Sequence, residues 1–435
     1  MHRLSRRAVL TLGATGLATL ATAGCPRSRR AAAAAPLPPR APGAPLPVTL
    51  AAVPRGGGPE ATAHAVRAAA LAVDDVAWLS RGDTVLLKVA SNSGNPYPAT
   101  TDPVAVRALA ELLLARGARR VIVADMSGVQ FVRFWKDGLR GSSRVLMERN
   151  GIARAAREAG AELQAFEEAG WDGFFEDRPA VGGTWAGPVM LPAVLREVDH
   201  VVLLPRTSRH LLAGSTLGLK AAVGWWRHDS RLEYHRDAAT FSEKTADANS
   251  VPTIVAKQRL VLTSATQVLA SFGPDQGHVH TPDSGLVFAS PSVVAHDMTS
   301  LAWLLEGRAA MPADQRHGPV DDPNESTVFV NLANRVVTAM LGGMGQALRT
   351  QHLTRYDLDT VWDDRVLRRA FRQTDGVPQI AFADADGSVP PALRDRLAAH
   401  VTPTSWSAPT GRLSTSGAAP AAASRPRAAA RFPST

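Results

Sequence analysis

Seven residues near the ends of predicted strands form a candidate anion-binding site. Lysine and arginine side chains beside hydroxyl groups and helix N-termini attract negative charge, because exposed backbone N–H groups and the helix dipole favour anions. A phosphate, carboxylate or sulfate group would suit such a site. The alternative is that the threonines are ordinary helix caps and the cations pair with nearby acids. The set consists of Lys88, Asn92, Thr100, Thr101, Arg206, Thr216 and Lys220.

A second set of residues has the chemistry of a divalent metal site. Carboxylates and imidazoles are the usual protein ligands of zinc, iron or manganese where thiolates are absent. The predicted ligands are Asp275, His278, His280 and Asp297, and the wider set adds Asp125, His210, His235 and His296. Asp125 and His210 are the predicted catalytic pair, either as acid and base or as metal ligands. The alternative is that the histidines are ordinary loop residues and that Asp297 caps a helix.

Several familiar catalytic motifs are missing from the chain. The sequence contains no G-x-S-x-G nucleophile elbow, no G-x-x-x-x-G-K-[ST] phosphate loop and no H-E-x-x-H metal helix. The glycines at 342, 343 and 345 follow a predicted helix and are interpreted as a helix stop. Whether the chain is an enzyme therefore stays open.

The elements that would position these residues alternate between short apolar runs and helical patterns. Strands are predicted at 48–53, 84–90, 120–124, 162–166, 200–204, 259–262 and 286–289, and helices at 61–79, 104–115, 145–159, 193–198, 211–226, 293–305 and 327–341. Near-continuous apolar strands between helices indicate an α/β fold, with a mostly parallel sheet covered by helices on both faces and a possible division into two lobes. In such sheets ligands bind beyond the carboxyl ends of the strands, where Lys88, Asp125 and Arg206 fall.

Four blocks of sequence resemble a known family. They are LLKVASNSG with ATTDPVAVRALAELLLARGARRVIVAD, then VVLLPRTSRHLLAGSTLGLKAAVGWW, then FGPDQG, and last GLVFASPSVVAHDMTSLAWLL. Their order and spacing over about residues 85–305 resemble the domain of unknown function 362 family. The resemblance implies an α/β fold and a set of shared positions, but no reaction.

The chain departs from that family in two respects. The family is sometimes fused to ferredoxin-type modules, whereas this chain has a single cysteine, so no Cys-ligated iron–sulfur cluster and no internal disulfide is expected. Where the family usually has Lys-Asn before a glycine, this chain has Lys220 followed by Ala221. The part of the site near that amide is therefore expected to differ.

The formal charge of +9 does not indicate a nucleic-acid partner. Twelve arginines lie within residues 1–55 and 412–431, where no acidic residue occurs, so the remainder carries a net charge near −3. A nucleic-acid protein needs its basic residues on a folded face. Residues 26–58 and 401–435 are rich in alanine, proline and arginine and are predicted to be a disordered linker and tail flanking an α/β domain at 59–400.

The first 25 residues predict export. Arg6 and Arg7 precede a short apolar segment and resemble a twin-arginine signal, which implies the twin-arginine export machinery as a partner; a general secretory signal is the alternative. Thr22-Ala23-Gly24-Cys25 resembles a lipobox, so Cys25 would carry a lipid anchor, while Ala21-Thr22-Ala23 also fits plain cleavage. The leading hypothesis is an exported, lipid-anchored protein, periplasmic or on the cell surface, that binds an anionic small molecule and a divalent metal in a strand-end pocket. The alternative is a non-catalytic lipoprotein that binds a ligand or partner.

Overall fold

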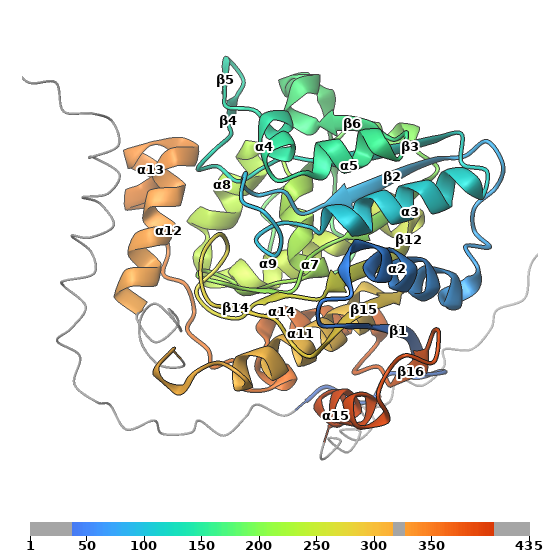
Figure 1. Ribbon diagram of the computed structural model, residues 1–435. Helices are drawn as coiled ribbons and strands as arrows, with labels where there is room; N and C mark the ends of the chain where they lie inside the picture. The colour runs from blue at the N-terminus through green and yellow to red at the C-terminus, as the bar shows by residue number, and fades with distance from the viewer. Residues whose placement is uncertain (1–36, 316–326, 404–435) are drawn as a thin grey trace, which may run out of the picture.

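The computed structural model describes residues 37–315 and 327–403 (Figure 1). The predicted export signal at Arg6 and Arg7 and the predicted lipidation site Cys25 lie outside these residues, as does most of the predicted tail. No helix in the described ranges is both long and apolar enough to cross a bilayer.

An eight-stranded sheet forms the centre of the molecule, in the order β16-β1-β15-β12-β9-β2-β3-β6. Its strands are β1 (Leu46–Pro54), β2 (Thr84–Val89), β3 (Arg120–Asp125), β6 (Glu162–Ala165), β9 (His200–Leu204), β12 (Gln258–Ala265), β15 (Ser284–Ser290) and β16 (Ile380–Asp384). All pairings are parallel except the two that β15 makes, with β1 and β12. The fold is therefore α/β with a mostly parallel sheet, as the sequence predicts.

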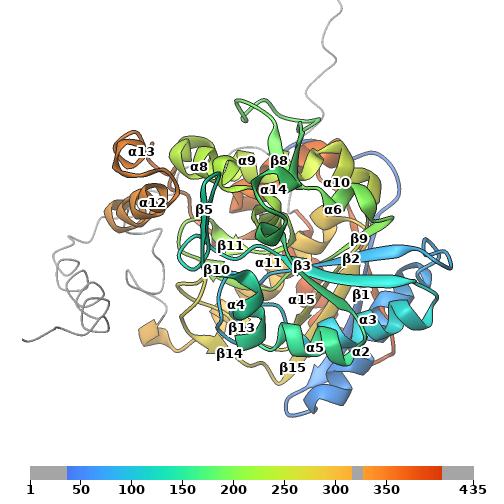
Figure 2. The ribbon, with the colours of Figure 1, turned by 90° about the horizontal axis from the view of Figure 1, so that it is seen from above.

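Helices cover both faces of this sheet, and each face has its own hydrophobic core (Figures 1 and 2). One face is covered by α2 (Gly58–Asp74), α3 (Pro103–Ala115) and α5 (Ile152–Glu158). The other carries α6 (Val194–Glu197), α7 (Gly218–Ala221), α11 (Val293–Ala309), α14 (Arg365–Ala370) and α15 (Pro391–Val401).

The position of a residue along β2 decides whether its side chain lies on the face covered by α2 and α3 or on the face covered by α7. Val85, Leu87 and Val89 pack into the core beneath α2 and α3, and Leu86 packs into the opposite core. Since successive side chains of a strand point to opposite faces, Lys88 lies on the same side as Leu86. This places its ammonium group beneath α7.

A group of smaller elements surrounds the carboxyl ends of the strands. A four-stranded sheet contains β10 (Ser208–His210), β11 (Gly214–Thr216), β13 (Val268–Leu269) and β14 (Val279–His280). Two hairpins consist of β4 (Arg133–Trp135) with β5 (Gly138–Arg140), and of β7 (Phe174–Asp177) with β8 (Val189–Pro192).

The remaining helices are α4 (Ser143–Arg149), α8 (His228–Arg236), α9 (Phe241–Asp247), α10 (Pro252–Lys257), α12 (Thr327–Gly342) and α13 (Met344–Leu348). Both α12 and α13 stand at one side of the molecule beside α8 (Figures 1 and 2).

Three predictions about local structure are wrong. The helix predicted at 145–159 is divided into α4 and α5, because Gly151 adopts a left-handed conformation (φ 89°) between them. The helix predicted at 211–226 is instead β11, α7 and a 3-10 turn, since β11 pairs with β10 and begins at Gly214, whose φ is 77°. The predicted linker at 26–58 contains the whole of β1, so its described part belongs to the folded sheet.

Candidate functional site: a cationic pocket at the strand ends

A cavity of about 440 Å³ lies at the carboxyl ends of the neighbouring strands β9, β2 and β3. Lys88 is near the end of β2, Asp125 is the last residue of β3, and Arg206 follows β9. Because parallel strands end at the same edge of a sheet, these three side chains meet there. Further lining residues come from β10, β11, α7, α8 and α12.

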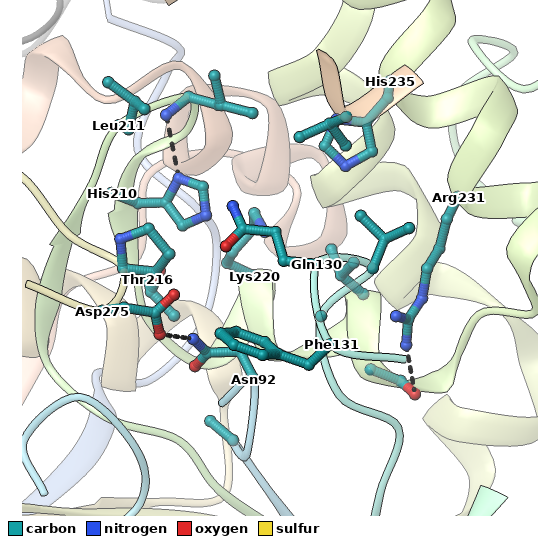
Figure 3. A pocket seen from close by; sticks show the side chains of 18 of the residues that line it. Asn92, Gln130, Phe131, His210, Leu211, Thr216, Lys220, Arg231, His235 and Asp275 are labelled. Carbon is teal, nitrogen blue, oxygen red and sulfur yellow. Dashed lines mark hydrogen bonds between the residues drawn. The ribbon is translucent and has the colours of Figure 1, made fainter. Parts of the chain in front are cut away.

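The cavity brings together most of the predicted anion site and part of the predicted metal set. Figure 3 shows His210, Lys220 and Gln130 pointing into one space, with Asn92 and Asp275 at its side. The predicted residues that line the cavity are Lys88, Asn92, Asp125, Arg206, His210, Thr216, Lys220, His235 and Asp275.

Lys88 and Asp125 form a buried ion pair. Lys88 Nζ lies 2.8 Å from Asp125 Oδ1 and also donates to the carbonyl oxygens of Val89 (2.8 Å) and Ala221 (3.0 Å). All three ammonium hydrogens are thus used, and the side chain is 1 % exposed. Burial lowers the pKa of Lys88, and the adjacent Asp125 carboxylate partly offsets this effect. The predicted role of Lys88 as an anion contact is therefore corrected to a structural one.

The Asp125 carboxylate also has its contacts within the protein. Besides the lysine, it accepts hydrogen bonds from the backbone N–H groups of Ser91 (2.6 Å) and Met126 (2.8 Å). These three donors hold the carboxylate in place, so Asp125 fixes the loops after β2 and β3. Its predicted catalytic role with His210 stays a prediction.

Arg206 is a buried cation that is only partly satisfied. Its Nη1 group donates to the carbonyl oxygens of Ala99 and Pro274 (2.8 Å to the latter). Its Nε group is buried and has no hydrogen-bond partner among the described residues. Burial lowers its pKa to about 10, against the opposing effect of Asp275 and Asp125.

Arg231 is a site residue that sequence reasoning missed. It lies on α8 and donates to the carbonyl oxygens of Trp226 (2.9 Å), Ser127 (2.6 Å) and Met126 (2.7 Å). These acceptors hold its position without neutralising its charge, and burial lowers its pKa to about 10. No local pattern marks it, since the polar sequence of α8 resembles that of an exposed helix.

Lys220 is the cation available to a ligand. Its ammonium group makes no hydrogen bond or ion pair within residues 37–315 and 327–403, and its only aromatic contact there is with the ring of Tyr234, 5.8 Å away. Burial lowers its pKa to about 7, and the positive charges of Arg206, Arg231 and Lys88 contribute further. An unpaired amine among other cations favours binding of an anion, which would restore its charge.

Two hydrogen-bond donors lie beside Lys220. His210 Nδ1 accepts from the backbone N–H groups of Leu212 (3.0 Å) and Ala213 (3.3 Å), so the neutral ring carries its proton on Nε2. Burial, followed by Lys220 and Arg206, lowers the pKa of His210 well below its usual value and keeps the ring neutral. The Thr216 hydroxyl is buried and has no partner in the described part of the chain.

The opposite wall of the cavity is apolar and comes from one helix. Seven residues of α12 line the cavity: Phe329, Leu332, Ala333, Val336, Val337, Met340 and Leu341. A polar link holds the helix in place, because His235 Nδ1 donates to Asn334 Oδ1 (2.8 Å) and Asn334 Nδ2 donates to the carbonyl of His235 (2.8 Å). Burial lowers the pKa of His235 to about 3, so this ring is also neutral.

The predicted metal ligands are not brought together. Within the described ranges, no group of three or more His, Cys, Asp or Glu residues is arranged to hold a metal ion. Asp297 is buried, and its oxygens accept from the N–H groups of Gly218 (2.8 Å) and Leu219 (2.7 Å), so it anchors the start of α7. Asp275 accepts from Asn92, and His280 belongs to β14. The prediction of a metal site formed by Asp275, His278, His280 and Asp297 is therefore wrong.

Thr100 and Thr101 also lie outside the cavity lining. The Thr100 hydroxyl donates to the carbonyl of Asn95 (3.0 Å). The Thr101 hydroxyl donates to the carbonyl of Leu204 and accepts from the N–H of Ala90 (2.8 Å). Both residues hold the loop after β2, and neither is an anion contact. The helix cap is Asp102, which accepts from the N–H of Val104.

The fold and the site define an α/β protein with a cation-rich pocket at the carboxyl edge of its sheet. The chain belongs to the family described as Domain of unknown function (DUF362), which matches residues 85–302, half of the chain. The matched range contains every polar side chain of the cavity wall, whereas α12 lies beyond its end.

Other comparisons reveal only distant similarity. No curated protein sequence matches the chain significantly. A protein from Thermotoga maritima, whose crystal structure was determined as a structural genomics target, is 16 % identical with a TM-score of 0.31. The aligned part covers 48 % of this chain and 51 % of that one, so this chain spans about half the length of that protein.

Proposed function

We propose that this protein binds an anionic small molecule in the strand-end pocket, with Lys220 as its principal charged contact. The observation that carries this proposal is the Lys220 ammonium group, which is unpaired among the described residues and lies inside a cavity lined by other cations. The Nε2–H of His210 and the hydroxyl of Thr216 are the accompanying donors.

The charge of the cavity lining supports an anionic ligand. The lining contains four basic residues, Lys88, Arg206, Lys220 and Arg231, against two carboxylates, Asp125 and Asp275. Lys88 and Asp125 neutralise each other, which leaves an excess of positive charge around Lys220. This excess of positive charge attracts an anion, because the cations that carry it are largely buried.

Binding without chemistry is the second candidate function. It is favoured by the contacts of Asp125, whose carboxylate is held by Lys88 and by the backbone N–H groups of Ser91 and Met126 rather than by His210. Turnover of a bound compound would indicate an enzyme, and saturable binding without change would indicate a receptor.

The test is calorimetric titration of the purified protein with sodium phosphate, sulfate and pyruvate at constant ionic strength. We expect saturable binding of at least one anion, and Lys220→Met should weaken it about 10- to 100-fold, the value of one charge-assisted hydrogen bond. Lys136→Met is the matched control, because Lys136 is an exposed residue of the β4–β5 turn that does not line the cavity. Absence of saturable binding, or equal weakening by both variants, would contradict the proposal.

We further propose that the protein is exported by the twin-arginine route and anchored by a lipid on Cys25. The support is the pair Arg6 and Arg7 before a short apolar segment, and the lipobox-like Thr22-Ala23-Gly24-Cys25. This route carries folded proteins, which suits a pocket assembled from distant parts of the chain.

A further inference from the structure

The cavity has two chemically different sides, and an inorganic anion would use only one of them. The cations lie on β2, on the segment after β9 and on α7 and α8, and the donors His210 and Thr216 lie on β10 and β11. The side formed by α12 presents seven apolar residues. The volume of about 440 Å³ falls within the range of roughly 300–1,000 Å³ that holds organic ligands. A bare phosphate at Lys220 would leave the apolar side in contact with water.

The apolar side continues to the mouth of the cavity. Leu332 and Val336, one helical turn apart, both line the cavity and are 44 % and 47 % exposed. Phe131, at 39 % exposure, also lines the cavity. Large exposed apolar side chains are costly in water unless something covers them. Their place at the entrance indicates that the covering group enters the cavity.

The wall formed by α12 is held in position by specific contacts. Besides the Asn334–His235 link, the indole Nε1 of Trp135 donates to the carbonyl of Leu341 (3.4 Å), and Asn331 Oδ1 accepts from the N–H of Leu353 (2.7 Å). These bonds connect α12 to α8, to the β4–β5 hairpin and to the segment after α13. The apolar wall is thus a fixed part of the pocket.

We infer that the ligand is an anionic amphiphile, a molecule whose phosphate, sulfate or carboxylate head lies at Lys220 and whose hydrocarbon part packs against α12. This inference rests on the proposed anion site and adds the chemical class of the rest of the ligand. The head group is set by residues of the family-matched range, and the hydrocarbon part by a helix outside it. The two parts of the ligand are therefore recognised by separate parts of the chain.

The test compares three probes by calorimetry below their micellar concentrations: sodium phosphate, octyl phosphate and the uncharged octyl glucoside. Each buried methylene contributes about fourfold in affinity, so burial of about four methylenes predicts octyl phosphate binding about 250-fold tighter than phosphate. Octyl glucoside should bind at least about tenfold more weakly than octyl phosphate, because it lacks the charged head.

Matched pairs of variants on α12 and α13 distinguish binding of the octyl chain in the pocket from its adsorption to the protein surface. The pair Leu332→Ser and Val336→Ser removes two apolar residues at the cavity mouth, and should weaken octyl phosphate about tenfold while leaving phosphate unchanged. The control pair is Leu348→Ser with Val328→Ser, which are 82 % and 80 % exposed and lie outside the cavity lining. All four residues are at least partly in water, so folding should survive in both proteins.

Each outcome distinguishes the two proposals. Tighter binding of octyl phosphate that depends on both Lys220 and the mouth pair supports the amphiphile. Equal affinity for phosphate and octyl phosphate overturns the amphiphile and leaves the anion site intact. Equal weakening by the control pair also overturns it, since the octyl chain would then adsorb to the surface. If neither phosphate nor octyl phosphate binds, both proposals fail.

Discussion

Lys220 has the least satisfied charge among the described cavity residues, and its protonation should control the binding of an anion. Burial and then the neighbouring Arg206 and Arg231 lower its pKa to about 7. Below that pH the amine is charged, and as the pH rises through about 7 the charge is lost. Sulfate keeps its charge throughout, so we expect its affinity to fall by up to about tenfold per pH unit above pH 7.

Calorimetry with sulfate from about pH 6 to about pH 9 measures this dependence. The other titratable groups that face the amine hold one state over this range, because the pKa values of His210 and His235 are far below it and those of Arg206 and Arg231 are about 10. Lys220→Arg is the control, since guanidinium stays protonated and the profile should become flat. A flat profile in the unaltered protein would show that Lys220 does not govern binding.

At the scale of elements, the short turn after α7 determines whether the Lys88–Asp125 pair can form. Gly224 lies so close to this pair that a methyl group there would overlap Asp125 Oδ1 and Lys88 Nζ. Both groups are buried and fully hydrogen-bonded, so neither can move without losing partners. We expect Gly224→Ala to lower the free energy of unfolding by about 2 kcal/mol or more.

Urea denaturation followed by circular dichroism gives this quantity. Gly187→Ala is the control, because a methyl group there would meet no atom within 4 Å. Its effect should stay within about 0.5 kcal/mol, as for most surface substitutions. Similar stability of the two variants would mean that the turn can move away from the ion pair.

At the scale of the whole molecule, the pocket is completed only when α8 and α12 pack together beside the sheet. Under the export route proposed above, the pocket would be assembled before the protein crosses the membrane. We expect replacement of Arg6 and Arg7 by lysines to retain the protein in the cytoplasm. We expect Cys25→Ser to release the exported protein from the membrane. Cell fractionation with immunoblotting measures both outcomes. Export of the lysine variant at the normal level would favour a general secretory signal.

Local patterns in the sequence predict the large sheet well. The strands at 84–90, 120–124 and 200–204 correspond to β2, β3 and β9, and the helix predicted at 104–115 corresponds to α3. Runs of apolar residues and capping residues act over a few positions, so they can be recognised without a structure. The helix predicted at 211–226 is wrong because pairing between β10 and β11 outweighs the helical pattern of that segment.

The sequence by itself determined which polar residues would gather at one edge, since Lys88, Asp125 and Arg206 each lie at or just beyond the end of a parallel strand and such strands end together. Only the tertiary structure decided what those residues can do. Hydrogen bonds to Val89, Ala221 and the backbone after β3 occupy Lys88 and Asp125, whereas Lys220 has no hydrogen-bond or ion-pair partner in the part of the chain that the structure describes. The apolar wall comes from α12, more than a hundred residues beyond Arg206 along the chain. The physical reason is that strand periodicity is a local property, whereas the availability of a charge depends on every group packed around it.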